Sequence, residues 1–262
     1  DLEAASLADV HNWFRDNYEP NNVVLVLSGD IDAATARPMV ERWFGHIPRG
    51  PDVRQVEAGP VTLAAPVEQV VTDQVPLPVI WRAWTGPGLD HPDSVALAVG
   101  MHVLGGLNSS RLDNALVRGE ELAVSVTAYA ETFEQLSLLV AQVDVRPDVP
   151  REAAQAALEA QIARLLAEGP TADELERAAT QLLAQTISAL ESVGDFGGKG
   201  SILAEGQLYR GDPAAYWRDL EAMVALTPAD VQGALQRWLA RPPFTLCVVP
   251  GERVLDGALM GG

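Results

Sequence analysis

The residues best suited to chemistry lie in the stretch LGGLNSSRL, residues 104–112. After an apolar run it places two glycines, one amide, two hydroxyls and one cation: Gly105, Gly106, Asn108, Ser109, Ser110 and Arg111. A phosphate-binding loop would need Lys and Ser or Thr directly after its last glycine, and a dinucleotide fingerprint would need Gly-x-Gly-x-x-Gly between a strand and a helix. Neither pattern is present. The spacing instead favours a glycine that caps one helix, an Asn or Ser that caps the next, and an Arg on the new helix.

Catalysis by Ser109 or Ser110 would require a nearby base and an orienting acid. The nucleophile-elbow pattern Gly-x-Ser-x-Gly is absent, and His102, one helix turn back, has no catalytic signature around it. The four histidines are scattered along the chain without ligand spacing: His11, His46, His91 and His102. Because no His-x-x-Glu-His or His-Glu-x-x-His motif occurs, the sequence predicts no catalytic residue and no metal ligand.

Composition limits the class of partner. The 262 residues carry a formal net charge of -18, a field that repels phosphate backbones and anionic membrane surfaces. Nucleic-acid binding is therefore disfavoured, whereas cationic peptides would be attracted, although acidic surfaces commonly confer only solubility. No apolar run is long enough to insert across a membrane, and no signal peptide is visible. Cys247 is the only cysteine and is interpreted as a small apolar strand residue.

The elements that precede this stretch begin with a helix-strand-helix unit in residues 1–50. A capping box of Ser6 and Asp9 opens the first helix, the apolar run VVLVLSGD at residues 23–30 predicts a strand, and residues 31–48 predict a second helix. A strand needs partners, but residues 51–66 are rich in Pro and Gly and are typical of a linker. Residues 1–50 are therefore predicted to be the end of a domain that began earlier.

Residues 67–262 predict a second, complete domain. Strands at 67–75 and 77–87 form a first antiparallel pair, a helix over 94–106 ends at the two glycines, and a helix restarts at Asn108. A second antiparallel pair follows at 122–131 and 136–145. Further helices follow, among them one opened by a capping box of Thr171 with Glu174, and a strand at 244–250 closes the chain. This order predicts an α+β fold, a layered domain with a mostly antiparallel sheet covered by helices.

The order of these pieces resembles the insulinase/pitrilysin (inverzincin) zinc metallopeptidase family, over nearly the whole chain. The first fifty residues match a family segment at nine positions: Tyr18, Pro20, Asn22, Gly29, Asp30, Phe44, Gly45, Ile47 and Pro48. LGGLNSSRL is similar to the Gly-Gly-x-x-Ser-Ser-Arg-Leu signature of the family's second domain. GPTADELERA resembles the entry to its long helix, and LTPADVQGALQRWL resembles its final helix. The chain is thus similar to the C-terminal portion of a bacterial-type processing-protease-like subunit.

The resemblance implies a role without a metal site of its own. The family's zinc ligands lie in the domain half that would precede Asp1, so no cofactor is expected in this chain and zinc is expected upstream in the parent protein. The chain would help to form the chamber that holds a peptide or protein substrate, and the interface between subunits. Residues Gly105, Gly106, Asn108, Ser109, Ser110 and Arg111 would be a substrate-chamber or interdomain loop. The alternative is a family member without catalysis that acts as a scaffold or partner subunit, so enzyme activity stays open.

One departure from the family concerns the partner. Many family subunits without zinc place an Arg and, seven residues later, a Tyr near the substrate, where this chain has Val117 and Val124. Arg118 is offset by one residue, which turns it about 100° around a helix. The resemblance therefore implies a second family subunit that carries the Arg/Tyr pair. Bacterial relatives of this short type are often exported, so export to the periplasm is a hypothesis that the sequence leaves open.

Overall fold

The computed structural model describes residues 4–53, 57–194 and 196–252. The chain divides into two compact units, one made of residues 58–183 with 221–262 and the other of residues 1–57 with 184–220. Helices α5 and α7 each cross from one unit into the other. The domain boundaries predicted at residues 50 and 66 stay a prediction.

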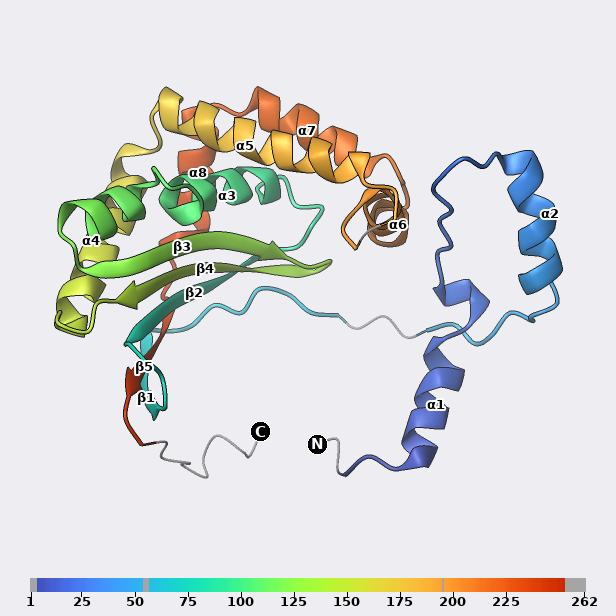
Figure 1. The fold of residues 1–262 in the computed structure, drawn as a ribbon, viewed down its shortest axis with the longest axis horizontal. Coiled ribbons are helices and arrows are strands. Elements are labelled where there is room, and N and C mark those ends of the chain that lie inside the picture. Colours follow the sequence, from blue (N-terminus) through green and yellow to red (C-terminus); the bar gives the residue numbers. More distant parts are fainter. Residues whose placement is uncertain (1–3, 54–56, 195, 253–262) are drawn as a thin grey trace. The chain divides into compact units, whose positions relative to one another are not determined.

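A five-stranded sheet forms the centre of the first unit, in the order β1-β5-β2-β4-β3 (Figure 1). All neighbouring strands are antiparallel except β1 and β5, which are parallel. The strands are β1 (Val67–Asp73), β2 (Val79–Pro87), β3 (Ala123–Thr132), β4 (Leu136–Val145) and β5 (Phe244–Pro250). The predicted α+β fold with a mostly antiparallel sheet is confirmed.

The predicted pairing of the first two strands is wrong, because β5 lies between β1 and β2. The connection between them contains Pro76 and Pro78, which have no N–H for a tight hairpin ladder. The last strand is a continuous apolar run, which favours a position with neighbours on both sides. Cys247 at its centre is fully buried, as expected for an apolar strand residue.

Helices cover one face of this sheet (Figure 1). They include α3 (Ser94–Met101), α4 (Arg151–Glu168), α8 (Pro228–Leu239) and the first part of α5 (Ala172–Glu191). The core lies between this layer and the alternate strand residues that point toward it, such as Ile80, Leu139 and Val143. In α4, Leu158, Ile162 and Leu165 recur at helical spacing and are buried in the core.

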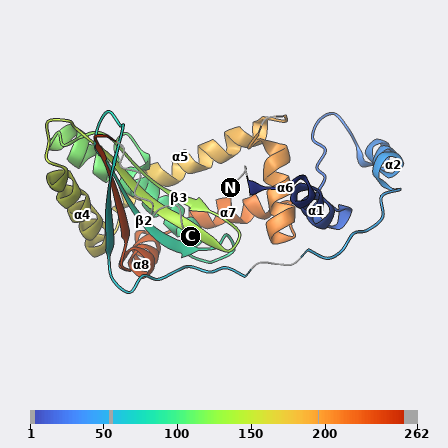
Figure 2. The same cartoon turned by 90° about the horizontal axis from the view of Figure 1, so that it is seen from below.

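Capping boxes fix where two of these helices begin. The predicted box of Thr171 and Glu174 is present at the start of α5, and Thr227 with Asp230 forms another at the start of α8. Residues 58–66 form no helix or strand, and Figure 2 shows them as an extended stretch that leads into β1. Within the described residues, no helix is long and apolar enough to cross a membrane.

The second unit contains α1 (Leu7–Asn17), a 3₁₀ turn (Pro20–Asn22) and α2 (Ala33–Phe44). The capping box of Ser6 and Asp9 is present. The strand predicted at residues 23–30 is not formed, since no neighbouring strand pairs with it in the part of the chain that the structure describes. The unit also contains the end of α5, α6 (Lys199–Arg210) and the beginning of α7 (Ala215–Ala225).

Candidate functional site

The stretch at residues 104–112 connects two helical segments, each of which contains a π-helical part, at His102–Gly106 and at Asp113–Gly119. Such wide turns are rare and are frequent at functional sites. Between them Leu107 is extended and Ser110 is buried, with only 2% of its surface exposed. The Ser110 hydroxyl accepts a hydrogen bond from the N–H of Asp113 at 3.3 Å, so Ser110 caps the second segment. The stretch therefore connects two helical segments, as the sequence predicted.

The predicted glycine cap is wrong. Gly105 and Gly106 are the last residues of the first segment, and neither has a positive φ. Their role is close packing: a Cβ on Gly105 would lie 2.6 Å from the N of Ala128 in β3. A Cβ on Gly106 would lie 2.1 Å from Nδ1 of His102. The glycines therefore let the helix end approach the sheet and the imidazole ring, because any larger residue would overlap them.

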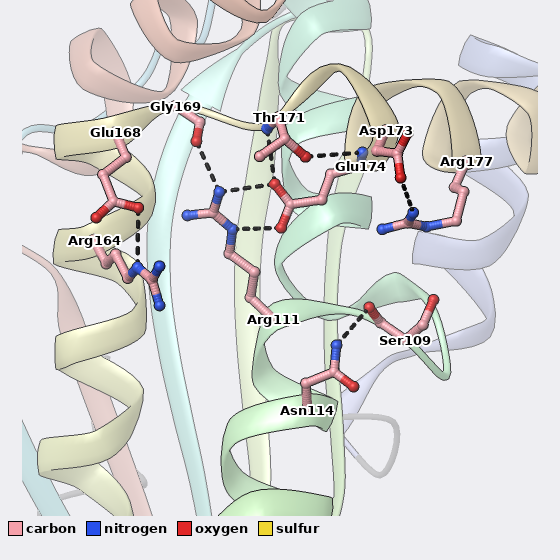
Figure 3. Close-up of polar contacts among 10 residues, drawn as sticks. All are labelled: Ser109, Arg111, Asn114, Arg164, Glu168, Gly169, Thr171, Asp173, Glu174 and Arg177. Atoms are coloured by element: carbon pink, nitrogen blue, oxygen red, sulfur yellow. Dashed lines mark hydrogen bonds and ion pairs between the residues drawn. The ribbon is translucent and has the colours of Figure 1, made fainter.

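Arg111 is the centre of a buried clamp (Figure 3). Its Nε and Nη2 donate to the two carboxylate oxygens of Glu174, each at 2.8 Å, and Nη2 also donates to the carbonyl of Gly169 at 2.8 Å. The side chains of Arg111 and Glu174 are 10% and 20% exposed. This bidentate geometry joins the loop to the end of α4 and the start of α5, segments that are far apart in sequence.

Glu174 is held ionised in this environment. Burial by itself would raise its pKa, but hydrogen bonds from Arg111 and Thr171 outweigh burial and lower the pKa to about 2. The Thr171 N–H donates to Oε2 of Glu174 at 2.8 Å, while the Glu174 N–H donates to the Thr171 hydroxyl at 3.2 Å. The carboxylate thus completes the capping box and the Arg111 clamp at once.

Two backbone carbonyls of the loop also accept hydrogen bonds within the fold. The carbonyl of Asn108 accepts from Nη2 of Arg118 at 2.5 Å, and the carbonyl of Ser109 accepts from the amide of Asn114 at 3.0 Å (Figure 3 shows the second pair). Only the side chains of Asn108 and Ser109 are exposed among the loop residues that the sequence singled out. The loop therefore divides into an exposed tip and four residues that support it.

The geometry does not favour nucleophilic chemistry here. Ser110 is buried and already serves as a cap, and burial lowers the pKa of His102, whose ring packs against Gly106. Among residues 4–53, 57–194 and 196–252, no group of three or more His, Cys, Asp or Glu side chains could hold a metal ion. The described residues thus do not supply a ligand set for zinc.

The two valines that the resemblance singled out, Val117 and Val124, differ in environment. Val117 is half-buried and packs against the core, whereas Val124 is 54% exposed on β3. Arg118 contacts the loop through the carbonyl of Asn108, and its Nε also donates to Asp113 of the second helical segment at 2.6 Å.

Sequence reasoning missed two partners. It placed Glu174 in a capping box but did not connect it with Arg111, 63 positions earlier, because only the fold brings them together. It also missed Asp93, whose buried carboxylate accepts hydrogen bonds from Arg237 and Trp238 and joins α3 to α8. No local pattern in the sequence marks either long-range pair.

A family model described as the peptidase M16 inactive domain matches residues 4–182. An uncharacterized zinc protease of Streptomyces coelicolor, SCO5738, is 24% identical over 257 residues, which cover 95% of this chain and 54% of that protein. Zinc protease PqqE of Helicobacter pylori is 25% identical over 202 residues, covering 76% of this chain and 45% of that protein. The chain therefore spans about half the length of these relatives.

Solved structures share the fold at lower identity. The crystal structure of a protease from Helicobacter pylori superposes with a TM-score of 0.83 at 20% identity, covering 95% of this chain and 60% of the other. A chain of complex III from Candida albicans superposes with a TM-score of 0.73 at 16% identity, covering 94% and 60%. At these identities the likeness concerns the fold alone.

Proposed function

Because the chain belongs to the peptidase M16 family through its inactive domain, we propose that it is the C-terminal, non-metal-binding part of a zinc-dependent endopeptidase subunit. Its role would be to help form the substrate chamber and the subunit interface. Its similarity to two proteins named as zinc proteases supports the zinc-protease context. Since the chain spans about half of those proteins, the activity of the parent is part of the proposal.

The observation that carries this proposal is the set of side chains on the sheet face opposite the helical layer. Within residues 58–183 and 221–252, the strand residues that point away from the core include half-buried apolar side chains such as Trp81, Leu138 and Leu246. The charged strand residues that alternate onto this face are all acidic: Asp73, Glu131 and Asp144. We propose that this face lines the chamber.

An extended chain already lies against one end of this face. The Thr85 hydroxyl donates to the carbonyl of Val61 at 2.6 Å, and the N–H of Ala58 donates to the side chain of Gln135. The segment is held by contacts with a hydroxyl and an amide, and it pairs with no strand edge. A second extended polypeptide could be accommodated on the rest of the face by the same kind of contact.

The loop has two parts in this proposal. Asn108 and Ser109 form the exposed tip and would face the chamber or the neighbouring domain. Gly105, Gly106 and Ser110 with Arg111 would keep that tip in place through the contacts described above.

A cleavage assay on the full-length subunit tests the proposal. Val117 and Val124 have no hydrogen-bond donor for a substrate backbone or a developing oxyanion, and one such donor is worth on the order of 3 kcal/mol. We expect the purified full-length subunit to be nearly inactive alone and to gain activity with a zinc-free family subunit that carries Arg and Tyr in the matching pattern. Full activity of a homogeneous preparation without that partner would contradict the proposal.

A scaffold without catalysis is the second candidate, favoured by the shared fold of the complex III chain. The coding sequence upstream of Asp1 separates the two candidates. A His-x-x-Glu-His motif there supports the endopeptidase, and its absence supports the scaffold. The same upstream sequence tests the hypothesis of export to the periplasm, which predicts a signal peptide.

A further inference from the structure

A pocket of about 310 Å³ lies on the helical side of the sheet, where α4, α8 and β2 meet. All of its lining residues belong to the first unit. Its walls are largely apolar, with Ile162 and Leu166 from α4 and Leu239 from α8. The segments that lead into β1 and β5 contribute three prolines: Pro66, Pro242 and Pro243. A small concave site with apolar walls and a few polar groups is typical of a binding site for a small organic molecule.

Two guanidinium groups line this pocket with donors that the fold does not use. Nη1 of Arg82 donates to Glu159 at 2.5 Å and makes a long contact of 3.5 Å with the hydroxyl of Thr245. Its Nε is buried without a partner, and its Nη2 makes no hydrogen bond with any described residue. Arg241 donates from Nε to the carbonyl of Arg237 at 3.1 Å. Neither Nη of Arg241 has a hydrogen bond or an ion pair within residues 4–53, 57–194 and 196–252.

Aromatic rings hold both cations in place. The Cζ of Arg241 lies 3.9 Å from the centroid of the Trp238 ring, and that of Arg82 lies 5.7 Å from the centroid of Trp84. Both distances are within the range of a cation–π interaction. The indole N–H of Trp84, which also lines the pocket, donates to the carbonyl of Arg241 at 3.0 Å. Groups that are ordered in advance lose less conformational entropy when a ligand binds.

The charge of the lining favours an anion. Two arginines and one carboxylate, Glu159, line the pocket, so its local charge is positive although the chain carries a net charge of -18. At physiological ionic strength, exposed charges more than about 8 Å away are largely screened, so the local charge outweighs the distant carboxylates. The planar fork of an arginine matches the two oxygens of a carboxylate. The apolar walls in turn favour a ligand with an apolar part.

From these observations, we propose that the pocket binds a small organic acid, which consists of a carboxylate on an apolar body. The carboxylate accepts hydrogen bonds from Arg241 and Arg82, and the apolar body packs against the side chains of α4 and α8. The site lies on the helical side of the sheet, opposite the face that we assign to the chamber. The inference therefore goes beyond the proposed function and does not depend on it.

Titration of this chain with hexanoate, followed by nuclear magnetic resonance of the indole N–H groups, tests the proposal. At pH 7 and an ionic strength of about 0.15 M, we expect a Kd on the order of 1 mM, as is usual for so small a ligand. The indole resonance of Trp84, assigned with Trp84→Phe, should shift. The resonance of Trp217, 57% exposed on α7 and outside the pocket, should not.

Two variants of the lining separate charge from shape. Arg241→Gln should raise the Kd at least about tenfold, because it removes the unused cation. Ala163→Phe changes an exposed residue of α4 that lines the pocket, so it should block binding while both arginines remain. The matched control is Arg42→Gln, which should leave the Kd unchanged. Arg42 also lies over an indole, 5.5 Å from the centroid of Trp43, and has no ion pair with any described residue, but it is outside the pocket.

Four results would overturn the proposal. No shift of the Trp84 resonance up to about 20 mM hexanoate shows that the pocket does not bind this class of ligand. Equal affinity for acetate or inorganic phosphate shows that the apolar walls play no part, and equal affinity for hexanamide shows that the charge plays none. Binding that both Arg241→Gln and Ala163→Phe leave unchanged shows that the ligand lies elsewhere. Acetyl-leucine, a mimic of the end of a peptide, shares the proposed chemistry, and tighter binding of it than of hexanoate would identify peptide ends as the source of the acid.

Discussion

Replacement of Glu174 by Gln should destabilise the fold strongly, although Glu174 touches no expected substrate. The substitution keeps the shape of the side chain and removes the charge that Arg111 contacts through two hydrogen bonds of 2.8 Å. Gln can still accept one bond from the Thr171 N–H, so the capping contact is weakened less than the ion pair. The guanidinium of Arg111, only 10% exposed, is then left without its counter-ion.

The lowered pKa of Glu174 gives the size of the stability loss expected for Glu174→Gln. A fall from 4.5 to about 2 corresponds to about 3 kcal/mol in favour of the charged form in the folded state. Because the folded-state pKa is lowered, this stability is present above about pH 4.5 and is lost as the pH falls toward 2. Glu174→Gln should therefore cost about 3 kcal/mol at pH 7, or roughly 6 to 12 °C in Tm. Its unfolding free energy should also depend less on pH between 4.5 and 2.

Urea unfolding at pH 7 and at several values down to pH 3 measures both effects. The matched control is Asp173→Asn, one residue earlier, where the carboxylate is 85% exposed and pairs with Arg177 across one helical turn. That surface pair should be worth less than about 0.5 kcal/mol. A loss below about 1 kcal/mol for Glu174→Gln, or equal losses for the two variants, would refute the clamp as a stabilising feature.

Three further predictions concern the glycines, the metal and the partner. Gly105→Ala should destabilise by about 1 to 3 kcal/mol in thermal unfolding, because its Cβ would overlap the backbone of Ala128, whereas Gly106→Ala meets only a side chain and should cost less. Metal analysis of chelator-washed protein should find no stoichiometric zinc in this chain, and peptide substrates should stay intact; one tightly held zinc per chain would contradict this. Val117→Arg with Val124→Tyr should not replace the partner subunit in a cleavage assay, and restored activity would contradict the assignment of that pair to the partner.

The sequence by itself determined the local structure of this protein. Capping boxes at Ser6 and Thr171 predict where two helices begin because their hydrogen bonds span only three residues. The buried stripe of α4 is equally local, since Leu158, Ile162 and Leu165 lie three or four positions apart and so share one face of the helix. The ordered motifs also indicated the family, which the match to its inactive domain confirmed.

Tertiary structure alone decided the long-range arrangement. The position of β5 between β1 and β2 depends on residues separated by more than 150 positions, and no local pattern encodes it. Gly105 follows a helix and so resembles a cap, but its real constraint is the backbone of β3, which only folding brings within contact. Arg111 likewise meets Glu174 because two helices and a loop converge there. An extended run such as residues 23–27 becomes a strand only when a neighbour supplies the other half of its hydrogen bonds.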